Sequence, residues 1–433
     1  MEKKIIWNKQ QEEALKDIKT HLINGNALAY TLMGYAGTGK TTLAGEIANA
    51  ADKKDWSVIF IAPTNKAAEV LRKKGNCART VHKLIYCVDK YGNKEKAWPL
   101  AHGCRNENGG LIICDEASML SDVLLNDLEE YAMHMGYKIL YMGDPFQLPP
   151  VGAYTRTVFD NEHKSVLTQV MRQGEGSAIL DWATALRQKK AAFSPSITNG
   201  DVSVEDKSTL WHDYLTNLKA GKDVTMVTWK NEARVRFNLG VRKALGYNGK
   251  TLQPGEPIMG ISNGMFLHNG ETQNVPENIE LVGKHQLFVD VPNRDKALAV
   301  IAEFYQYEED GYTRKIILVP DFQGASIAPQ KLRGIKYWIE KDAPEFLRKF
   351  VARYGKKLGL APDVTIATYG YAITAHKSQG SQWEEVYITG TSKLFGEQLT
   401  NARWLYTAVT RAENKVHILD GECAKLDWKD MIA

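Results

Sequence analysis

Cysteine, long apolar runs and an excess of charge of one sign are all scarce in this 433-residue sequence. Its five cysteines do not form a disulfide framework, so we expect a reducing, cytoplasmic environment. No run of 18 apolar residues occurs, which argues against a membrane-spanning helix. The first residues, Met1–Ile5, contain no apolar segment of the kind found in signal peptides. The formal net charge of +4 leaves a nucleic-acid partner open, because such binding depends on local charge.

The remaining composition is that of an ordinary globular protein, with 44% hydrophobic and 24% charged residues. Short apolar runs alternate with segments of helical spacing, which is typical of parallel sheets covered by helices on both faces. The pattern predicts two α/β domains. The first contains strands at 27–33, 57–61, 111–114 and 137–142 with helices at 41–51, 65–74 and 121–133; the second contains strands at 224–229, 364–368, 386–389 and 416–419.

Two segments interrupt this alternation. At 83–110 two short runs flank Tyr91–Lys94, which predicts a hairpin. From about 249 to 362 short alternating runs between Gly, Pro and Asn predict a small β-rich module inserted into the second domain. Within it, residues 331–357 carry nine Lys or Arg against three acids. This basic run fits either a solvated helix face or a nucleic-acid contact.

A glycine-rich phosphate loop is the motif that indicates the chemistry. Residues Gly34–Thr41 fit the pattern G-x-x-x-x-G-K-[ST], between an apolar strand and a helical segment. Such a loop turns backbone N–H groups toward phosphates, and the following helix N-terminus adds favourable potential. Lys40 is expected to reach the β- and γ-phosphates, and the Thr41 hydroxyl to ligate Mg²⁺.

Two acids follow the apolar run Leu111–Cys114. We expect Asp115 to hold Mg²⁺ and Glu116 to accept a proton from the attacking water or to orient it. Together with the phosphate loop, these residues predict a nucleoside-triphosphate hydrolase with ATP and Mg²⁺ at its site.

The order of further motifs resembles that of superfamily 1 helicases, and specifically the superfamily 1B group of RecD and Dda, from about Gln11 to Leu419. The motifs that carry the resemblance are Ala62–Ala68, Thr80–His82, Gly143–Pro150, Leu167–Gln173, Thr374–Gly380 and Leu405–Ala412.

This resemblance implies roles around ATP. Gln147 would sense the γ-phosphate, and Arg172 and Arg411 would act as arginine fingers. A glutamine near the N-terminus would read adenine, with Gln11 the better match and Gln10 still open. The remaining ATP contacts implied by the resemblance and the phosphate loop are Gly34, Ala36, Gly37, Thr38, Gly39, Thr42 and Gly380.

The resemblance also implies contacts with single-stranded DNA. They comprise Pro63, Thr64, Asn65, Thr80, His82, Thr374 and His376. Trp229 fits equally well as a stacking residue or as part of a core at a strand end. The hairpin matches the family's strand-separation pin, for which Tyr86, Tyr91 and Trp98 are candidate wedges, Trp98 being slightly preferred for its ring size.

The implied architecture is α/β: two RecA-like P-loop NTPase domains with a β-hairpin pin (1B) and an SH3-like module (2B). The expected boundaries are 1–172 for the first domain, with 83–110 as the pin, 173–270 with 363–433 for the second, and 271–362 for the module and its helical extension.

The implied function is an ATP-dependent DNA helicase that moves 5′ to 3′ as a monomer, in the cytoplasm of a bacterium or a phage-infected cell. Its partners would be single-stranded DNA, duplex forks, and a single-strand-binding protein or replication and recombination proteins, with no membrane partner. Two alternatives remain open: a superfamily 1B RNA helicase, and a nucleic-acid clamp that uses ATP as a switch without processive unwinding.

Overall fold

The computed structural model consists of two compact units, described here separately. Unit 1 comprises 1–88, 94–192 and 396–410, and unit 2 comprises 89–93, 193–395 and 411–433. The expected second domain includes the helix at 398–409, whereas the contacts of that helix place it in unit 1. The structure describes residues 6–88, 94–97, 108–149, 155–170, 177–188, 200–261, 272–289, 298–309, 312–320, 332–333, 364–389 and 398–419. Within these ranges no helix is long and apolar enough to cross a membrane.

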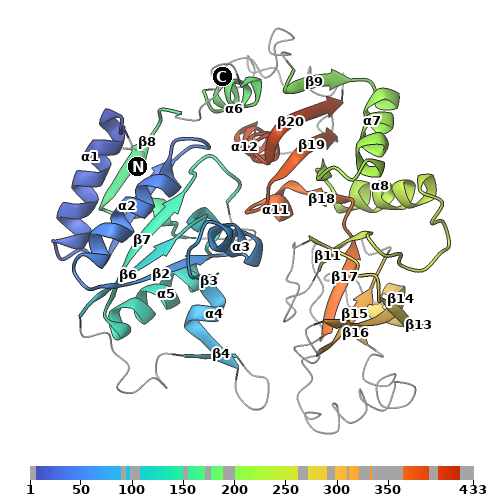
Figure 1. The fold of residues 1–433 in the computed structure, drawn as a ribbon, viewed down its shortest axis with the longest axis horizontal. Coiled ribbons are helices and arrows are strands. Elements are labelled where there is room, and N and C mark those ends of the chain that lie inside the picture. Colours follow the sequence, from blue (N-terminus) through green and yellow to red (C-terminus); the bar gives the residue numbers. More distant parts are fainter. Residues whose placement is uncertain are drawn as a thin grey trace. The chain divides into compact units, whose positions relative to one another are not determined.

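Unit 1 is built on a parallel sheet, as the alternating pattern predicts (Figure 1). Parallel neighbours in a sheet are joined by crossover connections, usually helical, rather than by tight turns. The strand order is β3 (Ala78–Thr80), β2 (Ser57–Ala62), β6 (Gly110–Cys114), β7 (Tyr137–Gly143), β1 (Ala29–Gly34) and β8 (Lys164–Leu167). The helices are α1 (Lys9–Ile18), a π turn (Lys19–Ile23), α2 (Lys40–Asp52), α3 (Asn65–Lys73), α4 (Val81–Ile85), α5 (Asp122–Met135), α6 (Ala178–Arg187) and α12 (Gln398–Val409), with short 3₁₀ turns at Ala117–Met119 and Val158–Asp160.

Strand β6 explains why the sheet is covered on both faces. Successive side chains of a strand point to opposite faces, and all of β6 is buried. Leu111 and Ile113 pack into a core with α1, α2 and α3, whereas Ile112 and Cys114 pack into a second core with α4 and α5. The continuous apolar run therefore reflects burial from both sides.

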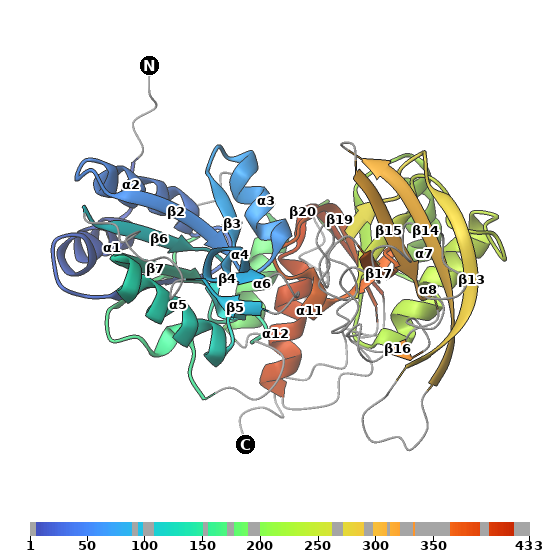
Figure 2. The ribbon, with the colours of Figure 1, turned by 90° about the horizontal axis from the view of Figure 1, so that it is seen from below.

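Unit 2 contains a second parallel sheet and a larger, mainly antiparallel one. The parallel sheet has the order β18 (Ala372–Thr374), β10 (Val224–Thr228), β19 (Trp383–Thr389), β20 (Ala412–Leu419) and β9 (Val202–Glu205), with helices α7 (Lys207–Lys219), α8 (Asn231–Ala244) and α11 (Ala375–Ser378). The other sheet has the order β12 (Thr272–Asn274), β11 (Pro257–Gly260), β17 (Val364–Tyr369), β15 (Tyr312–Leu318), β14 (Leu298–Glu309), β13 (Glu280–Val289) and β16 (Leu332–Arg333). Figure 2 shows the long strands β13, β14 and β15 side by side.

The placement of one predicted strand is wrong. The run 364–368 forms a strand, β17, but β17 pairs with β11 and β15 of the inserted sheet. Only after the turn at Gly370 does the chain enter the parallel sheet, as β18 beside β10. A buried apolar run has the same composition in either sheet, so its pattern does not identify its neighbours. The basic run 331–357 lies outside the described residues except for Leu332 and Arg333.

The inserted sheet and the parallel sheet share one apolar core. Met226 and Tyr387 of the parallel sheet lie in the same cluster as Tyr305, Ile316 and Leu318 of the inserted sheet. The insertion is therefore packed into unit 2 through its side chains as well as its chain connections.

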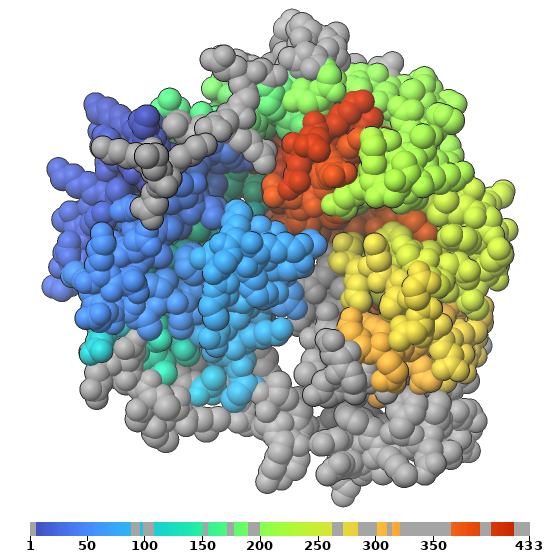
Figure 3. Space-filling view, in the orientation of Figure 1, coloured from blue at the N-terminus to red at the C-terminus, as the bar shows by residue number. Residues whose placement is uncertain are grey.

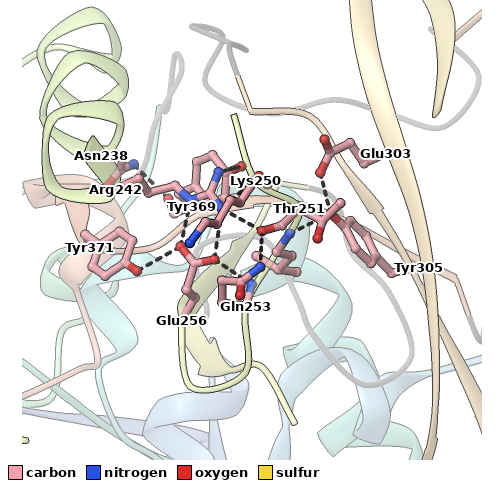
Figure 4. Close-up of polar contacts among 11 residues, drawn as sticks. Asn238, Arg242, Lys250, Thr251, Gln253, Glu256, Glu303, Tyr305, Tyr369 and Tyr371 are labelled. Carbon is pink, nitrogen blue, oxygen red and sulfur yellow. Dashed lines mark hydrogen bonds and ion pairs between the residues drawn. The ribbon is translucent and has the colours of Figure 1, made fainter. Parts of the chain in front are cut away.

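A buried polar joint reinforces this packing (Figure 4). On α8, Arg242 donates to both carboxylate oxygens of Glu256, with Nε–Oε1 2.7 Å and Nη2–Oε2 3.1 Å. Its Nη2 also donates to the Thr251 carbonyl at 2.8 Å. Tyr371 donates its hydroxyl to Glu256 Oε1 at 2.8 Å, and the guanidinium lies 4.3 Å from the centre of the Tyr369 ring. The joint thus links α8 to the segments before β11 and after β17.

Candidate nucleotide site and nucleic-acid contacts

The phosphate loop connects β1 directly to α2 in unit 1. Gly37 and Gly39 have φ angles of 76° and 84°, in the left-handed region that favours glycine. A Cβ at Gly39 would also lie 2.6 Å from Gln11 Nε2. Both glycines are therefore required by the turn that brings the backbone amides inward, as the motif predicts.

Lys40, the first residue of α2, folds back over this loop. Its Nζ donates to the carbonyl oxygens of Gly34 at 2.7 Å and Tyr35 at 3.0 Å. Phosphate oxygens are charged acceptors and form stronger hydrogen bonds than carbonyls. Thr41 is half-buried in the first turn of α2, and Thr42 is exposed.

Asp115 and Glu116 directly follow β6, which lies in the same parallel sheet as β1, the strand before the phosphate loop. Removal from bulk water, followed by repulsion from Glu116, raises the pKa of Asp115 above its usual range. Asp115 Oδ1 accepts a hydrogen bond from the Glu116 amide at 2.9 Å. Glu116 has a φ of 51°, a left-handed conformation that costs a non-glycine residue about 1–3 kcal/mol and recurs at functional sites.

These residues fit Mg²⁺. The ion prefers oxygen ligands, and the Thr41 hydroxyl and the Asp115 carboxylate supply them. A desolvated carboxylate with a raised pKa gains most from a nearby cation. When bound, Mg²⁺ would neutralise charge on the transferred phosphoryl group.

Gln147, the residue expected to sense the γ-phosphate, is 6% exposed. Among the described residues its Oε1 has no hydrogen-bond partner, although the atom is fully buried. A buried acceptor without a partner is costly. This position is therefore suited to a ligand that donates a hydrogen bond, such as a water molecule beside the γ-phosphate.

Tyr406 and Asp144 are site residues that the sequence reasoning missed. The Tyr406 hydroxyl on α12 accepts from the Ala36 amide of the phosphate loop at 3.1 Å and donates to Asp144 Oδ2 at 2.5 Å. On the same helix, the Thr407 hydroxyl accepts from the Leu148 amide at 3.1 Å. Both residues belong to quoted motifs, but their separation of 262 in the sequence hides the contact from local patterns.

We expect Tyr406→Phe to lower kcat for ATP hydrolysis about tenfold, because it leaves the buried Asp144 carboxylate and the Ala36 amide without their shared partner, a loss of about 1–3 kcal/mol. Steady-state kinetics would measure kcat and KM. Tyr137→Phe is the matched control, since its hydroxyl accepts only a surface hydrogen bond from Ser57 in the described contacts. Equal kcat in the two variants would contradict the prediction.

The two candidate adenine-reading glutamines have different contacts. The Gln11 side chain is buried, accepts from the Asn8 amide at 3.0 Å and donates to the Thr38 carbonyl at 3.1 Å. Gln10 accepts from the amides of Thr168 and Gln169, at 2.9 and 3.1 Å, and donates to the Thr168 hydroxyl. An amide group has two hydrogens and two lone pairs, so Gln11 keeps bonding capacity for adenine. The adenine role of Gln11 stays a prediction.

Of the two expected arginine fingers, the structure describes only Arg411. Arg172 lies outside the described residues. Arg411 belongs to unit 2, where it is 4% exposed and its Nη1 donates to the Ser381 carbonyl at 3.3 Å. Near it Gly380 has a φ of 76°. Their approach to ATP stays a prediction.

The expected DNA contacts of unit 1 lie where two helices begin. Thr64 and Thr80 follow the neighbouring strands β2 and β3, where Ala62 is the partner of Thr80. Their hydroxyls accept from the amides of Ala67 and Lys83, each at 3.2 Å, and so cap α3 and α4. A capping hydroxyl keeps its hydrogen for a phosphate, and the α3 N-terminus favours negative charge. Pro63 and Asn65 flank this cap, and His82 is half-buried against Tyr86.

In unit 2, Thr374 is the residue before α11 and is 7% exposed. Burial lowers the pKa of His376, so its imidazole is neutral at pH 7 and would meet a phosphate as a hydrogen-bond donor. Trp229 is half-buried directly after β10, and both of its interpretations stay open.

The base of the predicted pin is a short hairpin. Strand β4 (Tyr86–Val88) pairs with β5 (Lys94–Lys96), with Tyr86 opposite Lys96. Tyr86 donates its hydroxyl to Asp127 of α5, and Lys96 pairs with Asp127 and Glu130 at 2.9 and 2.7 Å. Figure 3 shows this light-blue segment at the surface of unit 1. Tyr86 is thus half-buried and fastened to α5, while Tyr91 and Trp98 lie outside the described residues.

The fold and this site define a P-loop nucleoside-triphosphatase. Residues 7–206 match the family described as AAA domain, and residues 369–419 match the UvrD-like helicase C-terminal domain. The chain is 33% identical over 163 residues to the ATP-dependent RecD2 DNA helicase of Deinococcus radiodurans, covering 37% of this chain and 22% of that protein. It is 28% identical over 272 residues to the ATP-dependent DNA helicase dda of Enterobacteria phage T4, covering 57% of each. The crystal structure of a Bacteroides Pif1 helicase with ADP-AlF3 and ssDNA superposes with a TM-score of 0.51 at 17% identity, over 96% of this chain and 93% of that one.

These comparisons support a superfamily 1B helicase of the RecD and Dda type, and the Pif1 structure shows the same fold. This confirms the expected family and the two RecA-like domains. The chain spans about half the length of Dda and less than a quarter of RecD2.

Proposed function

We propose that this protein is an ATP-dependent DNA helicase that moves 5′ to 3′ along single-stranded DNA and separates duplex DNA. Its relatives RecD2 and dda bear the name of DNA helicase. The polarity follows from the superfamily 1B resemblance. We also propose that it acts as a monomer with Mg²⁺–ATP, in the cytoplasm of a bacterium or a phage-infected cell, alongside a single-strand-binding protein or replication and recombination proteins.

The observation that carries the proposal is the linkage of three motifs around one hydroxyl. Tyr406 joins the phosphate-loop amide of Ala36 to Asp144, and the segment that carries Asp144 also positions the buried Gln147. A change at the γ-phosphate is therefore conveyed to α12 through two hydrogen bonds. A motor needs a connection between nucleotide state and chain position, since ATP acts only through contacts that differ between states.

The DNA side of the proposal rests on the capped helices α3 and α4. Their threonine caps and backbone amides are suited to phosphates, which fix a strand's position without reading its sequence. DNA and RNA share these phosphates, so the experiment that tests the substrate must compare both.

The test is ATP-dependent unwinding of matched duplexes that carry a 5′ or a 3′ single-stranded tail. We expect only the 5′-tailed DNA to be separated. Separation of only the 3′-tailed duplex would overturn the polarity, and preference for a 5′ RNA tail would favour an RNA helicase. If neither duplex opens while single-stranded DNA still stimulates hydrolysis, the protein is an ATP-switched clamp.

A further inference from the structure

A cluster of acidic side chains surrounds one buried histidine at the β9 edge of unit 2. Glu205 ends the edge strand β9, Asp213 lies on α7, and His417 lies on β20. Each offers a ligand atom, and these three atoms lie within 4.8 Å of one another. His417 is 1% and Glu205 8% exposed, whereas Asp213 is half-buried.

The two ring nitrogens of His417 face different surroundings. Nε2 lies 3.0 Å from Glu385 Oε2, and Glu385 is itself held by Lys222 at 2.8 Å and Asn217 at 2.8 Å. The ring stacks on Tyr387 with centroids 4.1 Å apart. A carboxylate that accepts from one ring nitrogen orients the imidazole and makes the other nitrogen a better metal ligand.

Nδ1, the other nitrogen, faces Glu205 Oε1 at 2.6 Å. The Ser203 hydroxyl bonds to the same carboxylate oxygen at 2.5 Å. The second oxygen of Glu205 is fully buried and has no hydrogen-bond partner among the described residues. A buried carboxylate oxygen needs a cation or a donor, because its desolvation is otherwise uncompensated.

We propose that Glu205, Asp213 and His417 Nδ1 bind a divalent transition-metal ion such as Zn²⁺. One imidazole and two carboxylates form a donor set that suits such an ion, with a water molecule as fourth ligand. The ion fastens the edge strand β9 and helix α7 to β20. The role is structural and separate from the ATP site, so it does not rest on the proposed helicase activity.

The competing occupant of this position is a proton. A doubly protonated His417 would donate to Glu205 and Glu385 at once, which satisfies both contacts without a metal. It leaves the second, fully buried Glu205 oxygen uncompensated. Metal binding and protonation at Nδ1 exclude each other, so a direct binding measurement separates the two.

The experiment uses the tag-free full chain, stripped with a chelator and dialysed against Zn²⁺ without nucleotide. Elemental analysis measures bound zinc. We expect the wild type to retain about one equivalent, and Asp213→Asn and Glu205→Gln to lose it. His212→Ala is the matched control, because this exposed neighbour on α7 lies outside the cluster. Zinc is also expected to raise Tm of the wild type and of His212→Ala, but not of Asp213→Asn.

If the wild type retains no zinc, the proposed metal site is wrong, and the proton on Nδ1 is the occupant instead. Equal retention by the wild type and both carboxylate variants would also overturn it, since the ion would then be bound elsewhere, for example at the exposed thiol of Cys77. Loss of zinc from His212→Ala would show that His212, and not His417, is the histidine ligand.

Discussion

Lys40→Ala is expected to lower the rate of DNA-stimulated ATP hydrolysis by about 10²–10³-fold, the loss that follows removal of one preorganised charge-stabilising group. The Lys40 ammonium group lies over the phosphate loop, 2.7 and 3.0 Å from two of its carbonyl oxygens. Phosphates placed in the loop would take over these hydrogen bonds, and alanine offers none. Steady-state hydrolysis with and without single-stranded DNA measures the loss.

The control for this change is Lys53→Ala. Lys53 is an exposed lysine at the opposite end of the same helix α2, so the control removes the same charge from the same element. Its rate should equal that of the wild type. If both variants hydrolyse ATP equally well, Lys40 does not act on the phosphates. Unwinding of 5′-tailed DNA should disappear together with hydrolysis in Lys40→Ala.

Arg242→Ala is expected to destabilise unit 2 by about 3–5 kcal/mol, because it leaves the Glu256 carboxylate buried without its bidentate partner. Arg242 and Glu256 are 5% and 2% exposed. Urea unfolding followed by hydrogen exchange at α8 and β11 measures the change, which should appear as a lower midpoint.

Arg236→Ala on the same helix provides the comparison. Arg236 forms an exposed i, i+4 pair with Glu232, and such surface pairs contribute about 0–1 kcal/mol. Replacing both buried partners, as in Arg242→Met with Glu256→Leu, should restore part of the stability, since no unpaired charge remains. Equal unfolding midpoints for Arg242→Ala and Arg236→Ala would show that the polar joint contributes little.

Local sequence patterns were sufficient for most of unit 1. The phosphate loop lies between β1 and α2 as predicted, because Gly37 and Gly39 need the positive φ that only glycine adopts without strain. The strand before Asp115 also forms where its apolar run predicts. In both cases the deciding interactions are close in sequence.

Contacts between distant segments escaped the sequence reasoning. The bond from Tyr406 to Asp144 and the pairing of β17 with the inserted sheet both join residues far apart in the chain. Neither depends on local spacing, since a buried tyrosine or a buried apolar strand satisfies the same pattern in several places. The left-handed backbone of Glu116 is equally invisible in sequence, because glutamate gives no indication of a positive φ.

The shared core of unit 2 limits how this protein could have been assembled or could be re-engineered. An inserted segment that is joined only by two loops can be exchanged between homologues without changes to the host domain. Here Tyr305, Ile316 and Leu318 of the insertion lie in one cluster with Met226 and Tyr387 of the parallel sheet. Excision would expose this apolar surface and favour aggregation. The inserted sheet and its host have therefore to change together, and a chimaera at this junction must carry both partners.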